Sequence, residues 1–287
     1  MKTLMNLLVE PGFFTSAPVQ TALIVGGGTA IVSGVVGVFT VIRGQSFAGH
    51  ALADVSSAGG ALSFLLGINP LIGVLGMALV AAIGMEMIDI RRARERDLMT
   101  GIVLGAGLGL SALLLYFDVT THSTTGAAIT VMFGSMFAIP PAIIPLALSL
   151  GGGALLAIFV IYRPLLLSSL DKELAEVMGI NTRRLAMFYL MLLSLAVTLA
   201  AMTVGAVLST ALLIGPAATA LRLTKRPLNA MLTAVIIGLV TTWGGILLAY
   251  NSYYWTPGHG WPVSFFIVAL IFVAYLAATH LIRIEGR

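Results

Sequence analysis

Long apolar runs alternate with short polar connections along this chain, and most runs have the length of a membrane-crossing helix, about 20 residues. A shorter run at 127–137 ends at a Pro140-Pro141 pair and predicts a re-entrant or broken helix, which lipid tolerates only where protein covers it. The pattern therefore predicts an all-α, polytopic transmembrane bundle of eight or nine spans. The predicted spans are 18–42, 47–67, 71–90, 98–117, 141–162, 184–203, 205–222, 228–250 and 262–282.

Composition supports a lipid environment, because 59% of the 287 residues are hydrophobic, only 9% are charged, and the mean hydropathy is +1.06. So little charge cannot cover the surface of a water-soluble protein of this length. The chain contains no cysteine, which excludes disulfides and thiolate metal ligands. Any metal site must therefore use imidazole, carboxylate, amide, hydroxyl or backbone oxygen.

The net charge of +4 has a topological explanation and does not indicate a nucleic-acid partner. The connections after residues 42, 90, 162, 222 and 282, together with the span ends that border them, hold fourteen of the fifteen lysines and arginines, whereas the connections at 118–126 and 251–261 hold none. Cytoplasmic loops are enriched in basic residues. We therefore expect an N-terminus outside the cell and a cytoplasmic C-terminus.

The chain is expected to form a single transmembrane domain over residues 17–283. Residues 1–16 are expected to form an amphipathic segment at the membrane interface, and residues 284–287 spell Ile-Glu-Gly-Arg, a protease site common in expression tags.

The glycine clusters, such as 26–28, are not followed by the Lys-Ser or Lys-Thr of a phosphate loop. Close helix packing explains these glycines better, so no nucleotide-hydrolysing machinery is expected in this chain.

His50 and Asp54 lie four residues apart inside an apolar stretch, where ionisable side chains are costly and mark candidate substrate or proton sites. In a helix that begins near Ser46, the pair shares one face, about 6 and 12 Å into a hydrocarbon core roughly 30 Å thick. Imidazole and carboxylate suit Zn²⁺, Mn²⁺ or Fe²⁺. Two ligands are too few, so another helix or a second copy of the chain must complete such a site. The alternative is a structural His–Asp hydrogen bond that fastens neighbouring helices.

Other ionisable residues are weaker candidates for the same role. Glu86 lies near the Arg91 cluster, which favours pairing with arginine over metal binding. His259 lies between aromatic anchors in a loop, where it is a ligand, a docking contact or an ordinary exposed histidine. Asp118 and His122 are expected in an outward loop, as features of substrate access at most.

A polar stretch at 168–180 is expected to form a short amphipathic helix on the cytoplasmic side. It offers a Ser or Asp N-cap, acidic residues Asp171 and Glu173 near its start, and Gly179 as a C-terminal cap. Its apolar face is available to a partner, although a solvated connector helix would have the same pattern.

Part of this stretch, 169–179, resembles the coupling-helix region of the membrane subunit of ATP-binding cassette (ABC) importers for zinc, manganese and iron. The block at 203–220 is similar to the most characteristic block of that family, and the segment at 43–54 is similar to its substrate-path segment. Weaker similarities at 94–101 and 132–135 extend the resemblance over nearly the whole chain.

The resemblance implies a permease subunit in a bacterial cytoplasmic membrane, without enzyme activity or a permanently bound cofactor. It implies a second permease copy, separate cytoplasmic ATP-binding subunits, and an extracytoplasmic metal-binding lipoprotein or periplasmic protein. The transported ion would be Zn²⁺, Mn²⁺ or Fe²⁺, and the residues of ATPase coupling would be Asp171, Glu173, Ala175 and Gly179.

The family typically carries Asp first and His four residues later in its path segment, so His50 and Asp54 present the same two ligand types in exchanged order. The exchange leaves the geometry and metal preference open. A secondary ion-coupled transporter would show repeated interrupted spans, which are not evident. A metalloenzyme would need a motif such as His-Glu-x-x-His, which the sequence lacks. An ABC importer of a metal chelate remains an alternative.

Overall fold

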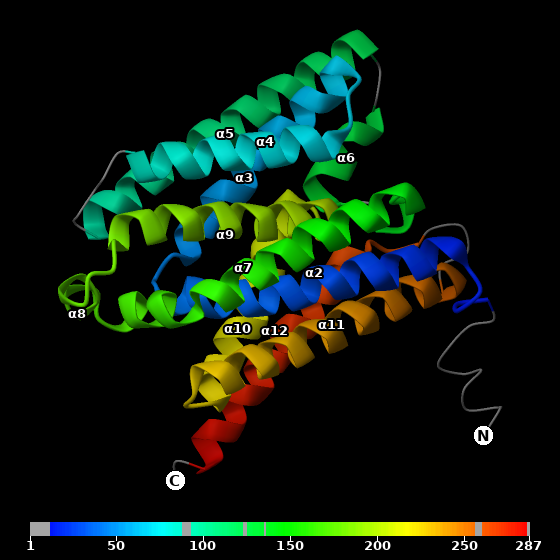
Figure 1. The fold of residues 1–287 in the computed structure, drawn as a ribbon. Helices are drawn as coiled ribbons and strands as arrows, with labels where there is room; N and C mark the ends of the chain where they lie inside the picture. Colours follow the sequence, from blue (N-terminus) through cyan, green and yellow to red (C-terminus); the bar gives the residue numbers. More distant parts are fainter. Residues whose placement is uncertain (1–11, 88–92, 123–124, 135, 256–259, 286–287) are drawn as a thin grey trace.

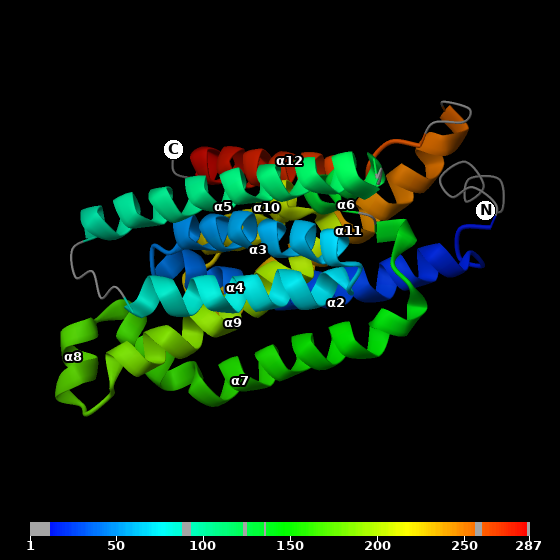
Figure 2. The same cartoon turned by 90° about the horizontal axis from the view of Figure 1, so that it is seen from above.

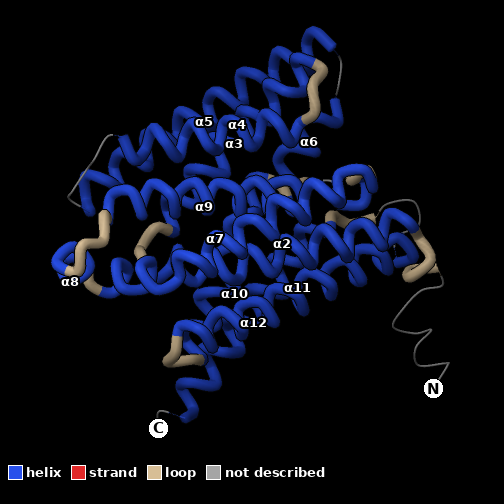
Figure 3. Tube along the Cα trace, viewed as in Figure 1, coloured by secondary structure: helices blue, strands red, loops and turns tan. Residues whose placement is uncertain are grey.

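The computed structural model describes residues 12–87, 93–122, 125–134, 136–255 and 260–285, and every element in these ranges is helical (Figures 1 and 3). Helical structure follows from the apolar composition, because backbone groups in lipid must be paired within their own segment. The elements are α2 (Ala17–Ile42), α3 (Ser46–Leu66), α4 (Pro70–Met87), α5 (Ala93–His122), α6 (Thr125–Phe133), η1 (Met136–Ala138), η2 (Pro141–Ile143), α7 (Ile144–Leu170), α8 (Lys172–Val177), α9 (Thr182–Val204), α10 (Ala206–Leu223), α11 (Pro227–Trp255) and α12 (Val263–Glu285).

Eight of the described helices are long and apolar enough to cross a membrane, namely α2, α4, α5, α7 and α9 to α12. The ninth predicted span, 47–67, forms α3, which has 21 residues but is not one of these eight. Its polar side chains face protein, because α3 packs against α4, α5, α9 and α10. The predicted bundle of eight or nine spans is confirmed.

The helices differ in how much of their surface the chain itself covers. In α2 and α9, 72% and 61% of the most apolar window is buried, whereas the value falls to 17% in α4 and 22% in α5 and α7. Figures 1 and 2 show α4 and α5 on the outside of α3, with α11 and α12 on the other side of the molecule. The outer helices present apolar side chains such as Phe159, Val160 and Ile102, as a lipid-facing surface would.

The predicted broken helix at 127–137 is present as α6, η1 and η2, and it packs against the break between α9 and α10. Gly134 follows α6 with φ of +74°, and Gly205 separates α9 from α10 with φ of +91°. A β-carbon on Gly134 would lie 2.6 Å from the Thr203 carbonyl oxygen, and one on Gly205 would collide with that of Met132. Glycine at both breaks therefore permits the two backbones to meet.

The basic connections gather at one end of the bundle. At the end of the molecule where α12 ends lie three connections: the one between α2 and α3, the α7–α9 connection that contains α8, and the one between α10 and α11 (Figure 1). The α3–α4 connection lies at the opposite end. The basic connections therefore share one end of the molecule, and its cytoplasmic orientation stays a prediction. The predicted interfacial segment lies largely outside the described residues, and α12 continues through Glu285 of the tag-like sequence.

The amphipathic helix is shorter than predicted. The expected span at 141–162 continues as α7 to Leu170, and α8 comprises only six residues instead of the stretch 168–180. Ser168 and Ser169 belong to the last turn of α7, because their hydroxyls donate to the carbonyl oxygen of Leu165. Asp171 is therefore the N-cap of α8, and neither serine is.

Candidate functional site

His50 and Asp54 lie on one face of α3, as their spacing predicts. Helix α3 begins at Ser46, directly after a turn in which Gly44 has φ of +63°. The His50 Nε2 atom lies 3.6 Å from Asp54 Oδ2, and the side chains are 39% and 4% exposed. This distance is too long for a strong hydrogen bond, and Oδ2 has no hydrogen-bond partner in the described structure. The pair is therefore a buried carboxylate facing a more accessible imidazole.

The other ring nitrogen of His50 faces α10. His50 Nδ1 lies 3.2 Å from the hydroxyl oxygen of Thr210, within hydrogen-bond distance. When Nδ1–H donates to this hydroxyl, the lone pair of Nε2 is directed towards Asp54 and is free to bind a cation. Thr210 is a site residue that sequence reasoning did not single out, although it lies in the 203–220 block.

The backbone around the pair is close-packed. A β-carbon on Gly49 would lie 3.2 Å from Leu213 of α10, so the small residue before His50 lets the two helices approach. Ser57 donates its hydroxyl proton to the carbonyl oxygen of Asp54 at 2.6 Å, and Ser56 donates to that of Ala53 at 2.7 Å. These hydroxyls satisfy the helix backbone and leave the Asp54 carboxylate to other partners.

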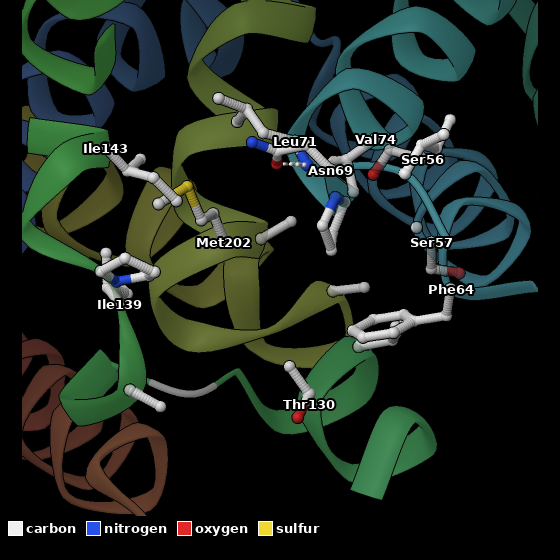
Figure 4. Close-up of a pocket in the computed structure, with 18 of the residues that line it drawn as sticks. Ser56, Ser57, Phe64, Asn69, Leu71, Val74, Thr130, Ile139, Ile143 and Met202 are labelled. Atoms are coloured by element: carbon white, nitrogen blue, oxygen red, sulfur yellow. Dashed lines mark hydrogen bonds between the residues drawn. The ribbon is translucent and has the colours of Figure 1, made fainter. Parts of the chain in front are cut away.

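A cavity of about 500 Å³ begins next to the pair along α3, in the direction away from the basic end. Ser56 and Ser57 line it from α3, Thr130 from α6 and Met202 from α9, while Asn69 closes the α4 side (Figure 4). The lining is mainly apolar with a few hydroxyl and amide groups. The cavity thus approaches the carboxylate-bearing turn from the end opposite α8.

The short helix α8 presents an exposed apolar surface at the basic end. Asp171 caps it, with Oδ1 accepting the Leu174 backbone N–H at 2.9 Å, and Gly179 ends the segment with φ of +81°. Ala175 is fully buried against the bundle. Four apolar side chains in and beside α8, which we call the α8 apolar patch, are 47–84% exposed, namely Leu170, Leu174, Val177 and Met178. Large exposed apolar groups of this kind mark contact surfaces for a partner.

The sequence pattern that defines the ABC 3 transport family matches residues 16–279 of this chain. The chain belongs to the ABC 3 transport family. The chain is 31% identical over 271 residues to the manganese transport system membrane protein MntC of Listeria innocua, covering 94% of this chain and 92% of that protein. It is 28% identical to the high-affinity zinc uptake system membrane protein ZnuB of Haemophilus influenzae, covering 79% and 86%.

The fold agrees with this membership. The structure of PsaBC from Streptococcus pneumoniae in complex with Fab superposes with a TM-score of 0.79 at 27% identity, over 93% of this chain and 92% of that chain. The predicted resemblance is therefore confirmed over nearly the whole sequence. As an ABC 3 family member whose described part holds eight helices long and apolar enough to cross a membrane, the protein is a multi-pass membrane transport subunit.

None of the weaker candidates that the structure describes is brought together with the pair of this ABC 3 family protein. Within the described residues, no three His, Cys, Asp or Glu side chains are close enough to hold a metal ion. Glu86 is half-buried near the end of α4, whereas the Arg91 cluster beside it and His259 lie outside the residues whose side chains are described.

The expectation of an outward loop at Asp118 and His122 is wrong. Helix α5 continues to His122, and Asp118 is fully buried on it. The hydroxyls of Thr120 and Thr121 donate to the carbonyl oxygens of Tyr116 and Phe117, which satisfies the polar residues within the helix. Polar composition alone therefore placed the end of this helix too early.

Proposed function

We propose that this protein is the permease subunit of an ABC importer that moves a divalent transition metal ion, Mn²⁺, Zn²⁺ or Fe²⁺, into the cytoplasm. The observation that carries the proposal is the pairing of the accessible His50 imidazole with the buried Asp54 carboxylate in an enclosed helix. Relatives named for manganese and zinc transport support the substrate class.

The separation of the two ligand atoms suits one bound ion. The two atoms, His50 Nε2 and Asp54 Oδ2, lie 3.6 Å apart. For an ion about 2.1 Å from both of them, the Nε2–ion–Oδ2 angle would be roughly 120°. Both atoms can therefore bind one ion without movement of α3. A cation would also offset the cost of keeping the Asp54 carboxylate out of water.

The remaining ligands must come from outside this pair, since a transition metal ion prefers four or more. The described part of one chain supplies no third His, Asp or Glu beside it. We assign the missing ligands to a second copy of the chain, which makes a homodimer with the path along its axis part of the proposal.

The two ends of the bundle have different partners in this proposal. Cytoplasmic ATP-binding subunits dock on the α8 apolar patch, with Asp171 and Glu173 beside it. An extracytoplasmic metal-binding protein delivers the ion at the opposite end, so the C-terminus is cytoplasmic. Closure of the ATPases then pushes on α8 and tilts the spans that line the path, and the ion rests at the pair before release.

Metal uptake by the complete transporter tests the proposal. Vesicles that hold this chain with its ATPase and binding protein would be compared for Mn, Zn and Fe uptake, using wild type, His50→Ala and Asp54→Ala. His280→Ala is a matched control, because His280 is exposed on α12 and far along the chain from α3. Loss of uptake in the two site variants, at equal membrane abundance, is the expected result. Undiminished uptake in both would refute the proposed site.

A metal chelate is a second candidate substrate because the cavity of about 500 Å³ next to the pair has the size of a small-molecule site. Uptake of the metal with and without a saturating chelator separates the two candidates. Preference for the free ion supports the first proposal, whereas uptake only of the chelated metal supports the second. Uptake without ATP would instead indicate a secondary transporter.

A further inference from the structure

Arg43 joins the end of α2 to the helices on both sides of α8. Its Nη1 donates to the hydroxyl oxygens of Ser168 and Ser169, each at 3.1 Å, in the last turn of α7. Its guanidinium carbon also lies 5.2 Å from the ring centroid of Tyr189 on α9. One side chain therefore contacts α7 just before α8, and α9 just after it.

The serine hydroxyls are oriented to receive this arginine. Both of them donate their protons to the carbonyl oxygen of Leu165, so their oxygens are left as acceptors for Arg43. Ser169 lies two residues before Asp171, the N-cap of α8. Movement of α8 thus reaches the serine pair through only one intervening residue.

The far side of α8 is attached as well. The Thr182 hydroxyl donates to Glu176 Oε1 at 2.6 Å and ties the end of α8 to the start of α9. On α9, the buried hydroxyl of Tyr189 lies 2.7 Å from Thr40 Oγ1 and 3.1 Å from the Val36 carbonyl oxygen of α2. The last turns of α2 are therefore held by Tyr189 as well as by Arg43.

The backbone links Arg43 directly to the helix that bears His50 and Asp54. Arg43 is the C-cap of α2, and its N–H donates to the Phe39 carbonyl oxygen at 2.9 Å. Two residues later the Gln45 N–H donates to the Thr40 carbonyl oxygen at 2.8 Å, and α3 begins at Ser46. His50 follows in the first turns of α3. A rigid turn of few residues thus separates the guanidinium from the imidazole.

We propose that Arg43 is the positioning residue through which movement of α8 reaches the His50–Asp54 pair. This inference rests on the proposed function and adds a route for its coupling. Arginine suits the role, because its planar guanidinium donates to two hydroxyls and stacks on an aromatic ring at the same time. When α8 moves with the ATPases, the contacts of Arg43 pull the end of α2 in the same direction, and α3 moves with it.

The test measures ATP hydrolysis and metal import in the same proteoliposomes, with the permease, ATPase and loaded binding protein assembled. The variants are Arg43→Ala and the double variant Ser168→Ala/Ser169→Ala, which removes the acceptors and keeps the arginine. Loss of charge-assisted contacts predicts a fall of about tenfold in metal ions imported per ATP hydrolysed. Arg43→Lys is expected to restore part of the ratio, because its ammonium still donates to the serines.

Arg222→Ala provides a matched control at the same end of the molecule. Arg222 Nη1 donates to the Thr279 hydroxyl at 3.1 Å, and its guanidinium carbon lies 4.7 Å from the Tyr275 ring centroid. It thus makes the same two kinds of contact, but between α10 and α12. The control is expected to keep the wild-type ratio of import to hydrolysis.

Four outcomes separate the possibilities. A reduced ratio in Arg43→Ala and in the double serine variant, with unchanged equilibrium metal binding to the permease, supports the proposal. A wild-type ratio in the double serine variant overturns it, even if Arg43→Ala fails to assemble. A parallel fall in hydrolysis and import also overturns it, because that result reports a structural role. Absence of metal import by the wild-type complex would refute the proposed function instead.

Discussion

Gly37 provides a direct measure of how closely α2 and α10 must pack. A β-carbon at this position would overlap the carbonyl oxygen of Leu213, and one on Gly49 of α3 would lie 3.2 Å from the Leu213 side chain. Because a backbone oxygen cannot rotate away, Gly37→Ala would force the helices apart by more than about 1 Å. Overpacking of this kind costs about 1–3 kcal/mol, against a gain of at most about 1 kcal/mol in helix propensity.

The assay is thermal unfolding of the purified permease, with Gly84→Ala as the control. Gly84 lies within α4, and apart from the adjacent backbone of its own helix no described atom lies within 4 Å of the position its β-carbon would take. Gly37→Ala is expected to lower Tm by several degrees, whereas Gly84→Ala should leave it unchanged or raise it slightly. Equal Tm values for the two variants would refute the close approach of α2 and α10.

Two further predictions concern the pair and the α8 apolar patch. Thr210→Val removes the partner of His50 Nδ1 and should weaken metal binding about tenfold in equilibrium measurements, while Thr210→Ser should retain it. Val177→Asp places a charge on the most exposed apolar side chain of α8 and should abolish co-purification of the ATPase subunit at normal membrane abundance. Leu223→Asp, at the same end but on α10, should co-purify normally, and similar losses in both variants would contradict docking on α8.

The apolar pattern predicted most of the helices, because length and hydropathy decide which segments cross a membrane. It also placed His50 and Asp54 on one helical face, since that depends only on local spacing. It did not reveal Thr210, which reaches His50 from a helix 160 residues later in the chain. Such pairing depends on tertiary packing, for which a single sequence carries no periodic signal.

Helix boundaries were the least predictable feature, because short polar side chains can bond either to a cap or to the preceding turn. Ser168, Ser169, Thr120 and Thr121 all bond back to carbonyl oxygens of their own helices, so those helices continue beyond their apolar runs. Asp171 instead accepts a forward N–H and starts a new helix. In the sequence all five residues are equally able to end or begin a helix, and only their hydrogen bonds distinguish them.

The enclosure of α3 has a consequence for how the protein is made. An Asp at the centre of a lone helix opposes membrane insertion by about 2.5–3.5 kcal/mol, and α3 contains Asp54 at such a position. The helices α9 and α10 that help to cover α3 leave the ribosome only after α4 to α8 have been synthesised. Stable integration of α3 therefore has to follow completion of the later helices, so truncation after α8 should leave this segment poorly inserted and exposed to quality-control proteases.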